Sequence, residues 1–88
     1  MLWRHFMIMG RVQGVWFRQT AKDNAVRIGI FGWVRNCPNG NVEALAGGSE
    51  AQLAQFEKCL YQGSAHSCVE SIQVTDCSPQ NFQDFSIR

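Results

Sequence analysis

The segment GRVQGVWFRQTA at residues 10–21 runs from a glycine turn into a helical pattern, yet it offers no side chain that could cap the helix. The first N–H groups of a helix are normally satisfied by Ser, Thr, Asp or Asn, but Gly14, Val15 and Trp16 stand there instead. Arg18 lies in the first turn, where the positive end of the helix dipole disfavours a cation. A helix start with open N–H groups and an arginine suits an anion, so this segment predicts a phosphate or carboxylate site.

The predicted anion cradle consists of backbone N–H groups from six consecutive residues at the start of the helix. These residues are Gln13, Gly14, Val15, Trp16, Phe17 and Arg18. The guanidinium of Arg18 adds a planar fork that matches the oxygens of a phosphate.

Asn36 is the second side chain expected at this site. If the first two strands of the fold run parallel, they end at the same edge of the sheet, one at the 10–18 loop and the other at Asn36. Side chains alternate along a strand, so Asn36 faces the helices if Val34 does, and it then points toward Arg18. The amide of Asn36 can donate to an oxygen or accept a hydrogen bond from a water.

Each of these residues also has a simpler interpretation when taken alone. Arg18 could be a solvated helix residue, Asn36 could serve turn chemistry, and Gly14 could only allow a tight turn. The argument for a site therefore rests on their combination. A different surface, with Met7, Met9, Trp33 and Leu45 on the open face of the sheet, could stack nucleic-acid bases, but it lacks a basic surround and the RNA-binding sequence pattern.

Hydrophobic periodicity predicts the elements that position these residues. The expected order is a strand at 4–10, a helix at 17–28, strands at 30–36 and 41–46, a helix at 50–62, and strands near 69–75 and 82–87. This βαββαβ order with a short additional strand predicts an α+β, ferredoxin-like split βαβ sandwich, with both helices on one face of an antiparallel-rich sheet. The second helix begins with a capping box, Ser49 to Gln52, so the same chain caps one helix and leaves the other open.

The composition is that of a single globular domain over residues 1–88. The net charge is +1 with no basic run, which argues against a nucleic-acid or membrane partner. No segment is typical of a secretion signal or a membrane span, so we expect a cytoplasmic protein with reduced thiols. His5 and His66 stand alone in the sequence, and the four cysteines, Cys37, Cys59, Cys68 and Cys77, form no C-x-x-C pair, so no metal site is expected.

Two segments resemble the signatures of the acylphosphatase family: GRVQGVWFR at 10–18 and GWVRNCPNGNVEALAGG at 32–48. The resemblance covers nearly the whole chain, including the closing FSIR. It implies a hydrolase of acid anhydrides, which splits an acyl phosphate into a carboxylate and inorganic phosphate without metal, cofactor or phosphoenzyme. By the same resemblance, Arg18 binds the phosphate, Asn36 orients the attacking water, and Gln13 to Arg18 form the backbone cradle.

Two departures from the family pattern lie outside both segments: GSAHSC at 63–68 replaces a loop that commonly contains proline, and the chain stops at Arg88 without a final aromatic residue. We expect them to affect local stability and contacts of the terminus, and not the activity. The expected ligands are small acyl phosphates, with phosphate or sulfate as competing anions, bound by a monomer. The acyl group is expected to matter little, because the expected contacts all fall on the phosphate.

Two further functions remain open for the same cradle. One is a non-catalytic module that binds an anion or an acyl phosphate, and the other is a carbamoyl-phosphate-handling domain of the kind found inside larger maturation enzymes. The chain begins with Met and ends with its last expected strand, which favours an enzyme that stands alone.

Overall fold

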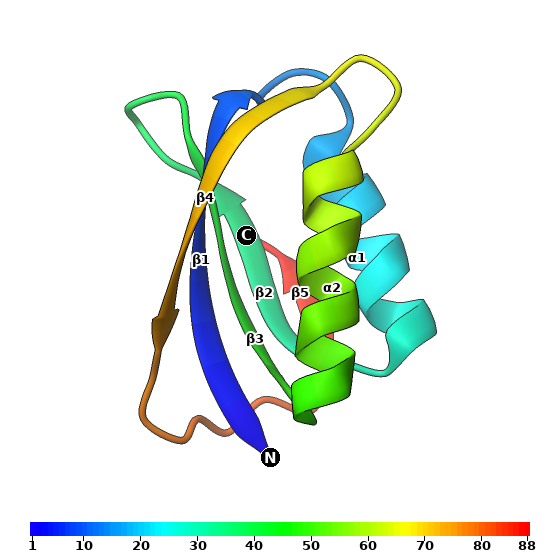
Figure 1. Ribbon diagram of the computed structural model, residues 1–88, viewed down its shortest axis with the longest axis vertical. Coiled ribbons are helices and arrows are strands. Elements are labelled where there is room, and N and C mark those ends of the chain that lie inside the picture. The colour runs from blue at the N-terminus through cyan, green and yellow to red at the C-terminus, as the bar shows by residue number, and fades with distance from the viewer.

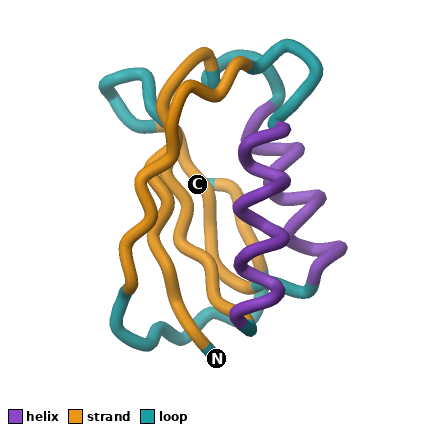
Figure 2. Tube along the Cα trace, in the orientation of Figure 1, coloured by secondary structure: helices purple, strands orange, loops and turns teal.

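Seven elements follow one another in the predicted order in the computed structural model, which describes residues 1–88. They are β1 (Leu2–Arg11), α1 (Phe17–Ile28), β2 (Phe31–Asn36), β3 (Val42–Gly48), α2 (Glu50–Gln62), β4 (Cys68–Asp76) and β5 (Phe85–Ile87). The five strands form one sheet, and both helices cover the same face of it (Figures 1 and 2). Neither helix is long and apolar enough to cross a membrane.

The sheet has the strand order β4-β1-β3-β2-β5. β3 lies between β1 and β2 and pairs antiparallel with both, so β1 and β2 run parallel to each other without touching. β4 adds an antiparallel edge beside β1, and β5 pairs parallel with β2 at the other edge. The predicted ferredoxin-like arrangement is therefore confirmed, including the short additional strand.

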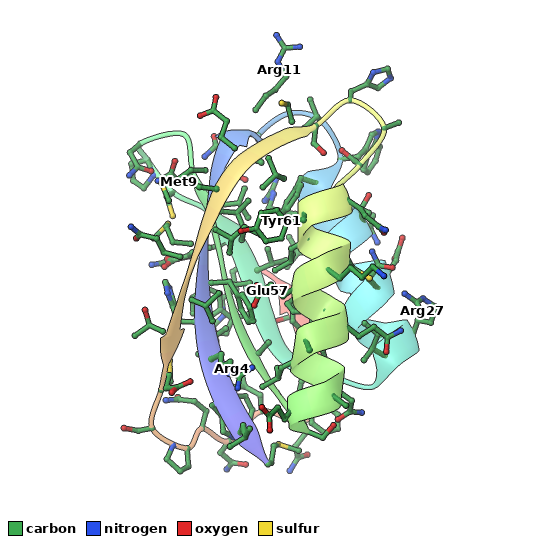
Figure 3. The ribbon with its side chains drawn as sticks, in the orientation of Figure 1. Arg4, Met9, Arg11, Arg27, Glu57 and Tyr61 are labelled. Carbon is green, nitrogen blue, oxygen red and sulfur yellow. The ribbon has the colours of Figure 1, made fainter.

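The core lies between the sheet and the two helices. Phe6 and Ile8 of β1 point into it, as their alternation predicts, and each is fully buried. Phe56 of α2 meets the edge of Phe6, with ring centroids 5.6 Å apart, and approaches Phe85 of β5 at 5.7 Å. Charged side chains such as that of Arg11 extend outward from the fold (Figure 3).

The last strand is shorter than predicted, because only residues 85–87 pair with β2 and not the expected 82–87. Phe82 leaves the strand pattern and packs against Trp3 on the face away from the helices, with ring centroids 6.1 Å apart. β1 and β3 are longer than predicted, since their pairing continues to Leu2 and Gly48. These boundaries depend on which residues find a partner across the sheet, and the local pattern does not contain that information.

The two helices begin in different ways. At α2, Ser49 Oγ accepts from the Gln52 N–H at 3.1 Å, and the Ser49 N–H donates to Gln52 Oε1 at 2.8 Å, which confirms the predicted capping box. The Gln52 amide also donates to the Ile28 carbonyl at 3.1 Å and so joins the start of α2 to the end of α1. At α1, the N-cap residue is Trp16, and no side chain caps the helix.

Ser49→Ala should lower the free energy of unfolding by about 1 kcal/mol, the usual effect of losing a serine N-cap. For a domain of this size, that loss corresponds to a fall in Tm of roughly 4–8 °C, measured by calorimetry or circular dichroism. Ser78→Ala is the matched control, because Ser78 is exposed and lies outside both helices. An equal Tm for both variants would show that the capping box does not stabilise α2.

Candidate functional site

The loop from β1 into α1 has a backbone that suits an anion. Gly14 has φ +73° and Trp16 has φ +64°, while Val15 between them does not have a positive φ. Alternation of left-handed and ordinary conformations turns successive N–H groups toward one concave side. The first N–H of this segment to reach a backbone acceptor is that of Thr20, which donates to the Trp16 carbonyl at 3.0 Å. The N–H groups before it are available to a ligand.

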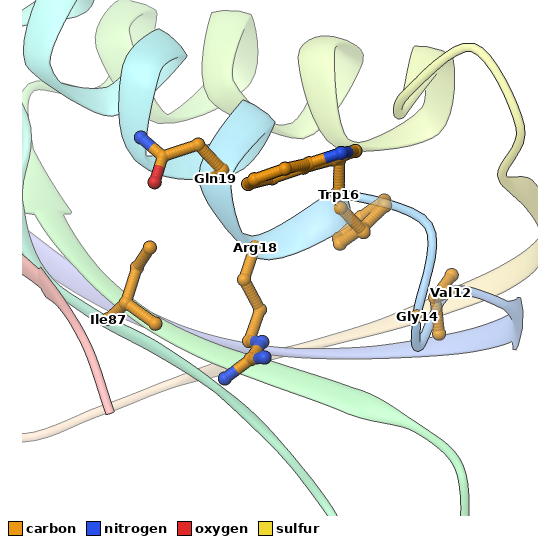
Figure 4. A pocket seen from close by; sticks show the side chains of 7 residues that line it. Val12, Gly14, Trp16, Arg18, Gln19 and Ile87 are labelled. Carbon is orange, nitrogen blue, oxygen red and sulfur yellow. The ribbon is translucent and has the colours of Figure 1, made fainter.

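Arg18 shares one pocket with this loop (Figure 4). The pocket has a volume of about 270 Å³ and is lined by Val12, Gly14, Trp16, Phe17, Arg18, Gln19 and Ile87. The Arg18 side chain extends from the first turn of α1 toward the sheet (Figure 4) and is half-buried. None of the ion pairs in the protein involves Arg18, so its positive charge is not neutralised by a carboxylate.

Asn36 is the last residue of β2 and pairs with Val42 of β3. Its Oδ1 atom is buried and has no hydrogen-bond partner in the protein. A buried acceptor without a partner is unusual, because its desolvation is not compensated, and a water that donates to it would compensate for that loss. Asn36 does not line the pocket that contains Arg18, so the candidate site has two parts, the pocket and the end of β2.

Gln13 joins these two parts. Its side-chain amide donates to the Cys37 carbonyl at 2.7 Å and to the Asn41 carbonyl at 2.8 Å. The loop before α1 is thereby fastened to the turn that follows Asn36. The sequence argument used only the backbone N–H of Gln13 and missed this role of its side chain, since nothing in the sequence shows which carbonyls the amide reaches.

The loop at 63–67 and the end of the chain lie closer to the site than their positions in the sequence indicated. The Ser64 hydroxyl donates to the carbonyl of Val15, inside the predicted cradle. Ser67 holds Ser64 in turn, because its hydroxyl accepts from the Ser64 N–H at 2.8 Å. Ile87 of β5 lines the pocket beside Arg18. The loop at 63–67 and the last strand therefore contact the candidate site, whereas the expectation that the two departures do not affect activity stays a prediction.

Cys37, which follows Asn36, is not poised as a nucleophile. Burial raises the pKa of the Cys37 thiol, the nearby Glu43 carboxylate raises it further, and Arg35 lowers it only in part. A thiol with a raised pKa stays protonated at neutral pH, and the thiolate is the reactive form. The four cysteines are all free in the structure.

A cluster of three hydrogen-bonded side chains, His5, Arg35 and Glu43, lies on the opposite face of the sheet. His5 Nε2 is 2.7 Å from Glu43 Oε2, and Arg35 Nε donates to the other oxygen of this carboxylate. Burial raises the pKa of Glu43, but the hydrogen bonds from His5 and Arg35 outweigh that effect, and its pKa lies below the usual value. Residues 42 and 44 of β3 point into the core, so Glu43 between them faces away from α1 and the pocket. No group of three or more His, Cys, Asp or Glu residues is arranged to hold a metal ion.

Comparisons with known proteins agree on one family. The family model described as Acylphosphatase matches residues 4–87. An acylphosphatase of Pasteurella multocida is 43% identical over 89 residues, which cover 100% of this chain and 99% of that protein. An acylphosphatase of Nitrosococcus oceani is 40% identical over 82 residues, which cover 93% of this chain and 92% of that protein.

Comparison with solved structures gives the same family. The crystal structure of an acylphosphatase from Bacillus subtilis superimposes with a TM-score of 0.97 at 39% identity, and the match covers 100% of this chain and 99% of that one. The resemblance inferred from the two signature segments is thus confirmed, and it extends over the whole fold. This chain is a member of the acylphosphatase family.

Proposed function

We propose that this chain hydrolyses acyl phosphates by direct attack of water, with Arg18 and Asn36 as its catalytic residues. The observation that carries the proposal is the pocket at the uncapped start of α1, where an arginine without an ion-pair partner lies beside a loop of open N–H groups. Membership of the acylphosphatase family supports the reaction class.

Arg18 and the cradle of N–H groups from Gln13 to Arg18 bind the phosphoryl group. Phosphoryl transfer depends mainly on positioning and on stabilising charge at the three equatorial oxygens. A guanidinium can contact two of these oxygens at once, and the backbone N–H groups approach from the end of the helix. Inorganic phosphate and sulfate present the same oxygens and compete for the site.

Asn36 orients the attacking water. Its buried Oδ1 atom is free to accept a hydrogen bond from that water, which leaves an oxygen lone pair available for the phosphorus atom. Gln13 supports this role, because it ties the turn after Asn36 to the loop that binds the phosphate. The protonated Cys37 thiol does not offer a covalent alternative.

The leaving group explains why this set of residues is sufficient. An acyl phosphate expels a carboxylate, whose conjugate acid has a pKa of about 4, so it departs without receiving a proton. The pocket is lined by no Asp, Glu, His, Cys, Lys or Tyr residue that could act as a general acid.

We infer that the enzyme acts as a cytoplasmic monomer without metal.

Arg18→Ala should lower kcat/KM for acetyl phosphate by at least ~10²–10³-fold, because a preorganised donor to the developing negative charge is removed. Arg18→Lys should not restore activity, since an ammonium lacks the planar fork. Steady-state kinetics of the purified variants measure both effects. Arg27→Ala is the matched control, because it removes the same charge from the same helix outside the pocket.

The binding of phosphate gives a second measurement on the same variants. Phosphate at 100 times its Kd should stabilise the wild-type protein by about 2.7 kcal/mol and raise its Tm. Arg18→Ala should lose this shift while keeping its fold. Activity within a few-fold of wild type in Arg18→Ala, or an equal Tm shift in both proteins, would contradict the assigned role.

Asn36→Ala should separate the chemical step from binding. If Asn36 contacts the water and not the phosphate, kcat should fall by about 10²-fold or more while the inhibition constant of inorganic phosphate stays within about two-fold. Both values come from one set of inhibition kinetics. A preserved kcat together with weaker phosphate binding would place Asn36 in the cradle instead.

The substrate class provides a further prediction. Acetyl and benzoyl phosphate should be hydrolysed rapidly in excess EDTA, and an alkyl phosphate such as glycerol phosphate should remain intact, because an alkoxide leaving group needs a general acid. Release of inorganic phosphate measures all three reactions. A strict metal requirement, or comparable rates on the alkyl ester, would overturn the mechanism.

A further inference from the structure

Neither the backbone conformation nor the packing of the core explains why residue 16 is a tryptophan. It is the only residue other than glycine with a positive φ, a conformation that is unfavourable for a bulky side chain. Its side chain is 78% exposed and contributes nothing to the buried core. Glycine or asparagine would satisfy the same backbone at lower cost. A strained position with no packing benefit points to a ligand as the reason for the residue.

Trp16 has an apolar neighbour across the pocket. Ile87 of β5 is 36% exposed and lines the same pocket, and Figure 4 shows Arg18 between these two side chains. Val12 and Phe17 also line the pocket but are almost completely buried, so Trp16 and Ile87 supply the apolar surface that a ligand can reach. Two chain segments about seventy residues apart in sequence thus meet on either side of the phosphate-binding arginine.

The size and charge of the pocket restrict what fits beside the phosphate. Its volume of about 270 Å³ is more than the five heavy atoms of one phosphate fill. Arg18 is the only charged residue that lines it, and Gln19 is the only other polar side chain. After Arg18 has paired with the phosphate, no other charged side chain lines the pocket, and an acyl group that carries its own negative charge finds no partner there.

We propose that Trp16 and Ile87 form a binding surface for the acyl group and make the enzyme prefer acyl phosphates with an uncharged aromatic or bulky apolar acyl group. This inference rests on the proposed function and deepens it. It also replaces the expectation from the sequence that the acyl group matters little, since that expectation considered only contacts with the phosphate. Trp16 and Ile87 determine specificity, and the chemistry remains with Arg18 and Asn36.

The test compares two non-hydrolysable analogues, phenacylphosphonate and acetonylphosphonate, in which a methylene replaces the bridging oxygen of benzoyl and acetyl phosphate. Calorimetry should give a Kd for the phenyl compound about ten-fold lower in the wild-type protein, the factor expected for one aromatic contact. Trp16→Asn should reduce the difference to within about two-fold, because asparagine accepts the left-handed backbone but lacks the ring. Trp16→Phe should retain the preference, and Ile87→Ala should reduce it in part.

Val26→Ala is the matched control, because Val26 is a 62% exposed apolar residue on α1 outside the pocket, and its variant should keep the full preference. The Kd of inorganic phosphate should be the same as in the wild-type protein for Ile87→Ala and Val26→Ala, which lie outside the cradle. Equal weakening of phosphate and both phosphonates by Trp16→Asn would show that Trp16 only shapes the cradle, and no change in any Kd would show that it contacts no ligand; either result overturns the inference.

The kinetics of the two acyl phosphates separate this inference from the proposed function. Trp16→Asn should lower the ratio of kcat/KM for benzoyl phosphate to kcat/KM for acetyl phosphate about ten-fold, whatever it does to both values together. If the wild-type protein hydrolyses both substrates equally well and binds both phosphonates equally, the acyl-binding surface is refuted and the enzyme assignment stands. If it hydrolyses neither substrate but still prefers the phenyl compound, the binding surface is supported and the proposed function is refuted.

Discussion

The position of β3 between β1 and β2 determines where the two main parts of the candidate site lie. Because β3 pairs antiparallel with both neighbours, β1 and β2 run in the same direction and end at the same edge of the sheet. The loop into α1 leaves from one of these ends, and Asn36 stands at the other. The distance between them is spanned by Gln13, whose two hydrogen bonds fasten the loop to the turn between β2 and β3. Strand pairing thus brings the two parts of the candidate site to one edge of the sheet, and the Gln13 side chain links them.

The two helices show how this fold distributes stability and function. α2 has a complete capping box that also reaches the end of α1 through Gln52. α1 has no side-chain cap, and an arginine follows in its first turn, where the dipole opposes a positive charge. A bound anion would reverse both disadvantages at once, because it would accept from the open N–H groups and neutralise the guanidinium. The helix that is poorly capped in the free protein is therefore the one suited to binding, and burial of Phe17, Ala21 and Ala25 keeps it in place.

Charged side chains on the two faces of the sheet differ in whether they have a partner within the protein. On the face away from the helices, the Glu43 carboxylate is hydrogen-bonded by His5 and forms an ion pair with Arg35, so its charge is compensated there. On the helix side, Arg18 has no such partner and its charge is available to a ligand. The same alternation of side chains along β3 that buries Val42 and Ala44 directs Glu43 away from Arg18, where a carboxylate would compete with phosphate.

The sequence by itself determined the order of the elements, the uncapped start of α1 and the capped start of α2, because helix caps, turns and hydrophobic periods are local properties of the chain. It also indicated Arg18 and Asn36, through two continuous segments and the rule that parallel strands end together. Only the tertiary structure decided that Gln13 reaches the carbonyls of Cys37 and Asn41, that Ser64 holds the carbonyl of Val15, and that Ile87 lies across the pocket from Trp16. These contacts join residues far apart in the chain, and their partners are selected by strand register and loop packing, which no local pattern of residues encodes.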